Sequence, residues 1–365
     1  IAGWGEAGQY GPPEPVATAI EHVLGPRIIG KPVQPTIISD ELYCFSRDFG
    51  QRGTYIEAIS GIDVALWDLL GKKLNAPVCQ LLGGAFRKRV KVYATGCYYR
   101  HDSNDPSTID VKQSAKAAAE EALGFKKAGF KAVKMKVGLL SVDEDLERVA
   151  AVREAIGPKI ALMVDSNHAY SASTACRMVK ELEKLDVRWF EEPVNPEDLE
   201  GYHRVRMAST VPIAGGECSF MRYGFRDYFV KGCVDIAQPD IAASGGLSEF
   251  MKICALASSF GVTVVPHVWG SAVGLAAGLH AVATMPMNPF TANPSYLENE
   301  PVIEFDRNPN PLRDDILKGA KFAIGPDGAV GVPLDKPGLG IEVDEEAVKR
   351  FHVPLKSKGF VVSKL

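Results

Sequence analysis

Three carboxylates in the middle of the chain have the spacing of a metal site. Asp165, Glu191 and Glu217 each end or closely follow a short run of apolar and β-branched residues, and the three runs succeed one another. In neighbouring parallel strands these carboxylates would meet at one edge and repel one another unless a proton or cation neutralised them. Singly, Asp165 could cap a helix and Glu191 could belong to a charged loop. Because hard oxygen ligands suit Mg²⁺, the spaced set predicts a Mg²⁺ site.

Two lysines precede these carboxylates at alternate positions of another apolar run. On a strand, Lys134 and Lys136 point to one face and their apolar neighbours to the other. In an antiparallel edge strand this would be an ordinary solvated face. In a parallel barrel strand the outer face packs on helices, so the lysines face inward. Two inward ammonium groups lower each other's pKa, which predicts a neutral lysine base near pH ~7.

A histidine and an aspartate end two further consecutive runs. Asp240 beside His267 would fix the imidazole tautomer and raise its basicity, giving a second acid/base group. The alternative is a buried histidine that bonds only to backbone. No motif supports Ser-His-Asp or Cys-His catalysis, since no GxSxG occurs and Cys218 lacks an obvious base partner. We expect Cys218 to line the wall of the site.

The elements that must position these residues alternate along the chain. We predict an α/β fold, a (β/α)8 TIM-type barrel. A doubly wound sheet is the alternative, but no GxGxxG follows any strand. The expected strands are 90–95, 132–137, 160–165, 187–191, 211–214, 234–238, 262–266 and about 295–297, with helices at 57–74, 111–128, 142–156 and 171–185.

Seven ionisable residues sit at or just past the ends of these strands, where barrel enzymes place their chemistry. They are Lys136, Asp165, Glu191, Glu217, Asp240, His267 and Glu298. One such group per strand–helix unit predicts a single site at the barrel mouth.

Composition narrows the function classes. Lys and Arg number 41 against 45 Asp and Glu, for a net charge of −4, which argues against a nucleic-acid partner. The uncharged stretch 253–297 is interrupted by Ser, His, Pro and Gly, so we expect no membrane span. Seven cysteines form no CxxC pair and indicate a reduced, cytoplasmic protein.

The chain divides into three parts according to where the alternation of strands and helices begins and ends. We predict an N-terminal capping domain at 1–87, the barrel at 88–307, and a C-terminal segment at 308–365 that returns to an α+β cap.

The residues singled out carry a family resemblance. The chain resembles the enolase superfamily, mandelate racemase subgroup, and within it the galactarolactone cycloisomerase-like acid-sugar enzymes. The shared motifs, in order, are LLGG at 81–84, KMK at 134–136, DSN at 165–167, FEEP at 190–193, GGE at 215–217, PD at 239–240 and PHVWG at 266–270. The family's first cap strands are missing before GWGE at 3–6, which suggests a truncated start.

The resemblance implies a role for each matched residue. Asp165, Glu191 and Glu217 would bind Mg²⁺. Lys136 would be the base on one face of the substrate, with Lys134 tuning it, and His267, oriented by Asp240, would act on the other face. Asn167 would bind near the substrate carboxylate, and Glu298, or Glu300 in the same stretch, would donate a proton to that carboxylate.

The implied reaction is removal of the proton α to the carboxylate of an acid sugar, an aldonate or aldarate or its lactone or anhydro form. Elimination of a β-oxygen then gives a 2-keto acid, by a dehydratase or a cycloisomerase. A racemase or epimerase is the alternative, and an inactive binding homologue a third. Gln51, Arg52 and Trp269 would bind the substrate. The resemblance also implies a homo-oligomer.

Overall fold

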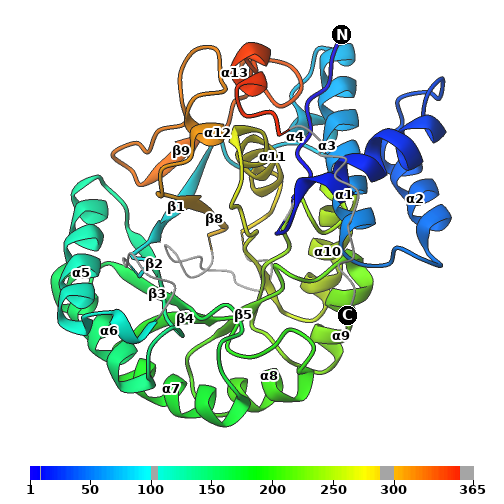
Figure 1. The fold of residues 1–365 in the computed structure, drawn as a ribbon. Helices are drawn as coiled ribbons and strands as arrows, with labels where there is room; N and C mark the ends of the chain where they lie inside the picture. Colours follow the sequence, from blue (N-terminus) through cyan, green and yellow to red (C-terminus); the bar gives the residue numbers. More distant parts are fainter. Residues whose placement is uncertain (9, 100–105, 288–299, 354–365) are drawn as a thin grey trace, which may run out of the picture.

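Eight parallel strands form the centre of the protein in a computed structural model that describes residues 1–8, 10–99, 106–287 and 300–353. Helices follow most of the strands and surround them (Figure 1). The strands are β1 (Arg89–Gly96), β2 (Ala132–Lys136), β3 (Ala161–Asp165), β4 (Val187–Glu191), β5 (Ile213–Gly215), β6 (Ile236–Ala237), β7 (Thr263–Val264) and β8 (Val302–Asp306).

The strands curl into a barrel. Hydrogen-bonded neighbours run in the order β7-β6-β5-β4-β3-β2-β1-β8, and every one of these pairs is parallel. The remaining gap is bridged just after β7, where the Val268 amide donates to Glu304 Oε2 on β8 at 3.1 Å. This arrangement confirms the predicted α/β barrel class.

The outer helices begin where the sequence provides caps. Asp110, Ser141 and Ser171 each accept a backbone N–H in the first turn of the helix that follows. The barrel helices are η3 (Pro106–Thr108), α5 (Val111–Lys127), α6 (Val142–Ile156), α7 (Ala172–Lys184), α8 (Leu199–Arg206), α9 (Met221–Val230), α10 (Gly246–Ser259) and α11 (Ala272–Ala283). The helices predicted at 111–128, 142–156 and 171–185 are therefore confirmed within a residue.

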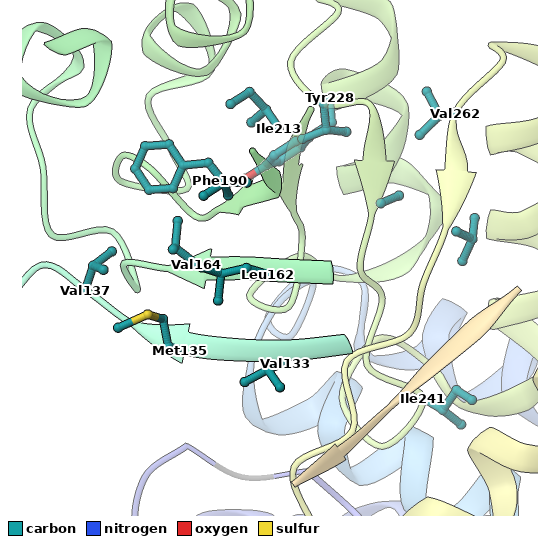
Figure 2. Packing of buried hydrophobic residues seen from close by; sticks show 14 of the residues in the cluster. Val133, Met135, Val137, Leu162, Val164, Phe190, Ile213, Tyr228, Ile241 and Val262 are labelled. Atoms are coloured by element: carbon teal, nitrogen blue, oxygen red, sulfur yellow. The ribbon is translucent and has the colours of Figure 1, made fainter. Parts of the chain in front are cut away.

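The apolar residues of β2 pack outward, as the alternation predicted. Val133 and Met135 join Leu162, Val164 and Phe190 in the core between strands and helices (Figure 2). The intervening polar residues must then face the barrel interior. A second layer closes the amino-terminal end of that interior and leaves the carboxyl end for polar groups. Its fully or largely buried members are Tyr93, Ala132, Met163, Trp189, Ala214, Val265 and Val302.

The first 87 residues form a helical layer beside the barrel, and the described part of this segment contains no strand. Its helices are α1 (Pro13–Thr18), η1 (Ala19–Leu24), η2 (Gly25–Arg27), α2 (Pro35–Ser46), α3 (Thr54–Leu74) and α4 (Val78–Leu81). The helix predicted at 57–74 corresponds to α3. Buried Asp63 of α3 ties this layer to the barrel, because its Oδ2 accepts the Ser248 N–H at the start of α10 at 2.9 Å.

The C-terminal segment contacts both the barrel and the N-terminal layer. It contains α12 (Pro311–Asp314), β9 (Ala329–Gly331) and α13 (Glu345–Lys349). β9 pairs antiparallel with β1, while the Leu339 N–H donates to Asp68 of α3 at 2.8 Å. The domain bounds of 1–87, 88–307 and 308–365 stay a prediction.

The eighth strand differs from the expectation. The stretch 295–297 lies outside the described residues, and the strand that pairs with β1 is Val302–Asp306. Among the helices that the structure describes, none combines the length and apolar character needed to cross a bilayer.

Candidate active site

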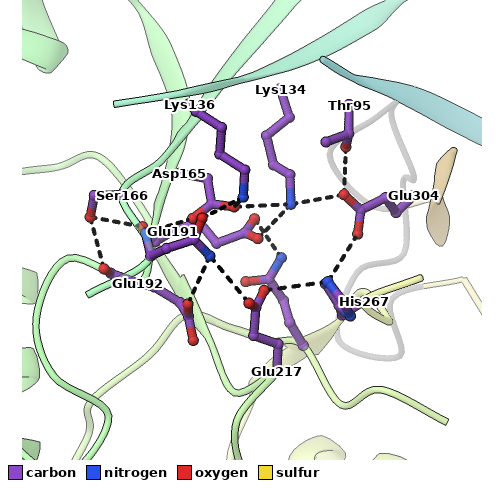
Figure 3. Close-up of polar contacts among 12 residues, drawn as sticks. Thr95, Lys134, Lys136, Asp165, Ser166, Glu191, Glu192, Glu217, His267 and Glu304 are labelled. Atoms are coloured by element: carbon purple, nitrogen blue, oxygen red, sulfur yellow. Dashed lines mark hydrogen bonds and ion pairs between the residues drawn. The ribbon is translucent and has the colours of Figure 1, made fainter. Parts of the chain in front are cut away.

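The three predicted metal ligands lie together at the carboxyl ends of β3, β4 and β5. Asp165 ends β3 and Glu191 ends β4, and the two are register partners. One ligand oxygen from each of Asp165, Glu191 and Glu217 lies within 4.8 Å of the others, and all three side chains are buried (Figure 3). The predicted trio is therefore brought to one place.

The neighbouring positive groups do not fully compensate the negative charge of these three buried carboxylates. Burial, and then neighbouring carboxylates, raise the pKa of Glu191 and of Glu217 to about 7, although Lys134 and His267 oppose the rise. Burial also disfavours the Asp165 carboxylate, but Lys136 and Lys134 outweigh it and hold its pKa below the ordinary value. Three buried, hard oxygen donors in this state fit a divalent cation of the Mg²⁺ kind.

Both lysines point inward from β2, as predicted. Lys134 Nζ is 2.5 Å from Glu191 Oε1 and 3.0 Å from Glu304 Oε1. Lys136 Nζ is 2.5 Å from Asp165 Oδ2 and 2.6 Å from Asn167 Oδ1. Lys134 is fully buried, whereas the Lys136 side chain keeps 17% of its surface exposed and is the one that a substrate can reach.

Lys134 does lower the pKa of Lys136, as predicted, but the predicted net result, a lysine that is neutral near pH ~7, is wrong for this arrangement of charges. Burial lowers the pKa of Lys136, and Lys134 lowers it further, but attraction to Asp165 outweighs both and holds the pKa above its ordinary value. The same balance raises the pKa of Lys134 through Glu191 and Glu304. The sequence pattern places two ammonium groups side by side but does not reveal how many carboxylates face them.

Asn167 links the lysine to the carboxylates. Its Oδ1 accepts from Lys136, and its Nδ2 lies 3.2 Å from Glu217 Oε1 and 3.3 Å from Glu192 Oε2. Its backbone has φ of 40°, which an N–H bond to Asp165 Oδ1 at 3.0 Å helps to hold. The amide is therefore fixed in orientation at the mouth of the barrel.

His267 and Asp240 form the predicted pair. His267 Nδ1 lies 2.6 Å from Asp240 Oδ2, and Nε2 lies 3.6 Å from Glu217 Oε2. Burial lowers the pKa of His267, but Glu217, the bond to Asp240 and Glu304 together raise it to about 10. The ring is thus a cation that lies against one carboxylate of the trio while Lys136 lies against another.

The eighth-strand glutamate at the site is Glu304, which the sequence interpretation missed. Its Oε1 accepts from Lys134 and, at 2.5 Å, from Thr95 Oγ1, and its Oε2 lies 3.9 Å from His267 Nε2. Glu298 lies outside the described residues. Glu300, the alternative, lines a cavity near the amino-terminal ends of the strands, so it is at the wrong end of the barrel. The signal for Glu304 was an acid flanked by apolar residues on both sides in the stretch 302–305.

The expected substrate-binding residues border two cavities. Gln51 and Arg52, both exposed, line a cavity of about 840 Å³ together with His168 and Cys218. Trp269, 54% exposed, lines another of about 380 Å³ together with Asp240 and His267.

The N-terminal segment supplies contacts that no motif indicated. Tyr10 Oη lies 3.3 Å from Asp240 Oδ2 and 3.4 Å from His267 Nδ1. Partly buried Glu6 accepts the backbone N–H groups of Ser271 and Gly274 at 2.8 and 2.7 Å, at the start of α11. The segment before α1 therefore reaches the His267 side of the site.

Comparisons of sequence and of structure with known proteins both identify the family that the sequence motifs resemble. Residues 1–83 match the N-terminal domain profile of mandelate racemase/muconate lactonizing enzymes, and residues 115–347 match the enolase C-terminal domain-like profile. D-galactarolactone cycloisomerase of Agrobacterium fabrum is 43% identical over 96% of this chain and 88% of its own length. Arabinonate dehydratase of Saccharolobus solfataricus is 36% identical over 96% of this chain and 87% of its own.

Solved structures of related enzymes have the same fold as this chain. The 3,6-anhydro-D-galactonate cycloisomerase of Zobellia galactanivorans superimposes with a TM-score of 0.82 at 42% identity, over 96% of this chain and 90% of that one. A racemase of Streptomyces coelicolor with bound magnesium does so with a TM-score of 0.79 at 29% identity, over 94% and 86%. The chain belongs to the mandelate racemase/muconate lactonizing enzyme family of the enolase superfamily.

Proposed function

We propose that this enzyme removes the proton α to the carboxylate of an acid sugar and eliminates a β-oxygen to give a 2-keto acid. The observation that carries the proposal is the pairing of two acid/base groups with one carboxylate trio. Lys136 contacts Asp165, and His267 contacts Glu217. A substrate bound at the trio would have a proton-transfer group on each side.

Asp165, Glu191 and Glu217 would hold a Mg²⁺ ion, whose positive charge would stabilise the enediolate oxygens as negative charge develops on them. Buried oxygen donors and the raised pKa values of Glu191 and Glu217 support this assignment. Lys134 would add a second, permanently positive group on the same side, because Glu191 and Glu304 hold it charged and buried.

Lys136 would act as the base. It must lose a proton first, and neutralising Asp165 removes the attraction that keeps the ammonium group charged. Glu217, which also raises the pKa of Lys136, would be neutralised with the rest of the trio, and burial and the charge of Lys134 would then favour neutral Lys136 against the smaller effect of Tyr98. The partial exposure of Lys136 lets the α-carbon approach Nζ.

His267 would act as the acid. A cation at the trio would weaken the attraction of Glu217 for the ring, but the bond to Asp240 and the charge of Glu304 would still raise the pKa of His267, so the ring would have a proton to give to the leaving β-oxygen. Asp240 would hold the ring through Nδ1 and leave Nε2 toward the substrate. Departure of a hydroxyl would make the enzyme a dehydratase, and departure of a ring oxygen would make it a cycloisomerase.

The substrate class rests on the relatives. Proteins 43% and 36% identical to this chain are named for a galactarolactone and for arabinonate, and the superimposed structure is named for an anhydrogalactonate. Asn167 would orient the reacting carboxylate, while Gln51, Arg52 and Trp269 would bind the rest of the sugar from the two cavities that they line. Seven free cysteines support a place in the reducing cytoplasm.

A screen of aldonates, aldarates, their lactones and anhydro sugars tests the proposal, with Mg²⁺ present and 2-keto acid formation as the readout. Elimination predicts a 2-keto acid from at least one of them. The racemase alternative is distinguished in D₂O, where it predicts deuterium at C2 with the leaving group retained. That result with no 2-keto acid from any compound would overturn the elimination proposal.

A further inference from the structure

A second cluster of ligand-type side chains lies next to the carboxylate trio and takes no part in the mechanism above. His168, Glu192 and Cys218 follow β3, β4 and β5, just past the trio. One donor atom from each, a ring nitrogen, a carboxylate oxygen and the thiol sulfur, lies within 4.8 Å of the others. Glu192 is fully buried, whereas His168 and Cys218 are half-buried and line the cavity of about 840 Å³.

Two buried atoms of this cluster lack hydrogen-bond partners. Within the part of the chain that the structure describes, neither Glu192 Oε1 nor His168 Nδ1 makes a hydrogen bond. His168 Nδ1 lies 3.0 Å from Glu192 Oε2, close enough to form an ion pair but without the alignment of a hydrogen bond. A fully buried carboxylate with an unpaired oxygen is costly, and a bound cation relieves that cost.

The backbone holds the cluster in place. The His168 N–H donates to the Glu192 carbonyl at 2.9 Å, and the Glu192 N–H donates to Ala214 at 3.0 Å. His168 and Glu192 have φ of 61° and 45°, which non-glycine residues adopt only when the surroundings impose it. The Ser219 N–H closes a turn onto Gly216 at 2.9 Å and so fixes Cys218 between them.

We propose that His168, Glu192 and Cys218 bind a thiophilic divalent cation of the Zn²⁺ class at a site separate from the carboxylate trio. One nitrogen, one oxygen and one sulfur donor suit Zn²⁺ or Co²⁺ and do not suit Mg²⁺. Asn167 stands between the two sites, with its amide in contact with both Glu192 and Glu217. Three protein ligands leave a fourth position open toward the cavity that Gln51 and Arg52 line.

Co²⁺ is the probe, because a cobalt–thiolate bond gives a charge-transfer absorption band that oxygen ligands do not give. The thiol proton passes to solvent as the bond forms. Co²⁺ is titrated into the chain of residues 1–365 in saturating Mg²⁺. The expected result is one equivalent bound with the thiolate band, retained in Cys44→Ser, an exposed cysteine on α2, and lost in Cys218→Ser.

Two further variants keep the test independent of folding defects and of the proposed reaction. Glu192→Gln, which keeps the thiol, is expected to weaken Co²⁺ binding at least about tenfold. Glu191→Gln, which removes a proposed Mg²⁺ ligand, is expected to retain the band even if turnover is lost. Circular dichroism confirms that each variant is folded. Absence of the band in the wild type, or its persistence in Cys218→Ser, would overturn the proposal.

Discussion

Asp63 gives the sharpest prediction about how the N-terminal layer is held on the barrel. Its side chain is buried in α3, where Oδ2 accepts the Ser248 N–H at 2.9 Å and Oδ1 has no partner among the described residues. Burial raises the pKa of Asp63 from the ordinary 3.8 to about 7, although the bonds from Ser248 and the charge of Lys252 oppose the rise.

The sign of the effect follows from proton uptake. The folded protein binds this proton more tightly than the unfolded chain, so the stabilising contribution is complete below about pH 4 and is lost as the pH rises to about 7. Three units at about 1.4 kcal/mol each give a change of about 4 kcal/mol in the free energy of unfolding. Asp63→Asn cannot ionise, so it removes this dependence.

The expected result is therefore a change in the stability difference between variant and wild type. Between pH 4 and pH 8 that difference shifts by about 4 kcal/mol in favour of Asp63→Asn. The asparagine keeps an acceptor for Ser248, and its buried amide nitrogen costs about 1–3 kcal/mol at every pH. The pH-dependent part alone therefore reports on the carboxyl group.

The assay is urea unfolding at several pH values, followed by both tryptophan fluorescence and circular dichroism so that coincident transitions can be verified. Asp143→Asn, on the exposed surface of α6, is the matched control. A stability difference that stays constant within about 1 kcal/mol across this range would refute the reasoning.

Three further predictions concern the active site. Glu304→Gln removes the charge that pairs with Lys134 at 3.0 Å and leaves one acceptor oxygen where Lys134 and the Val268 N–H now use two. We expect kcat to fall about 10²-fold, and a loss below threefold would contradict the role of Glu304. Asp240→Asn removes the carboxylate that lies 2.6 Å from His267 Nδ1. We expect kcat to fall at least about 10²-fold with little change in KM. An unchanged kcat would argue against a role for the His267–Asp240 pair. Chelation of the metal is expected to abolish turnover and to lower the melting temperature, because a cation at 100 times its Kd adds about 2.7 kcal/mol of stability. Adding Mg²⁺ is expected to restore both. Full activity after exhaustive chelation would exclude the metal.

The sequence predicted the features that depend on local pattern. Alternation in 132–137 correctly assigned Lys134 and Lys136 to the inner face, because their apolar neighbours need the outer core. One acid at the end of each strand likewise predicted that Asp165, Glu191 and Glu217 lie close together, because the carboxyl ends of parallel strands meet at one edge of the sheet.

The features that were missed depend on contacts between distant segments. The lysine pKa values were wrong in direction because Glu304 and Asp165, which outweigh the mutual repulsion, come from other strands. Glu304 itself was overlooked because the eighth strand was predicted at about 295–297, whereas the strand that pairs with β1 is Val302–Asp306. Tyr10 reaches His267 from the other end of the chain, and no local pattern encodes such a contact.

The role of Lys136 as the base is the central claim, and Lys136→Ala tests it most directly. The measurement is the single-turnover rate of 2-keto acid formation from the acid sugar that the wild type converts, with Mg²⁺ saturating and the fold verified by circular dichroism. A loss of general-base catalysis predicts a fall of at least about 10²-fold. A rate within tenfold of the wild type would show that another group removes the α-proton.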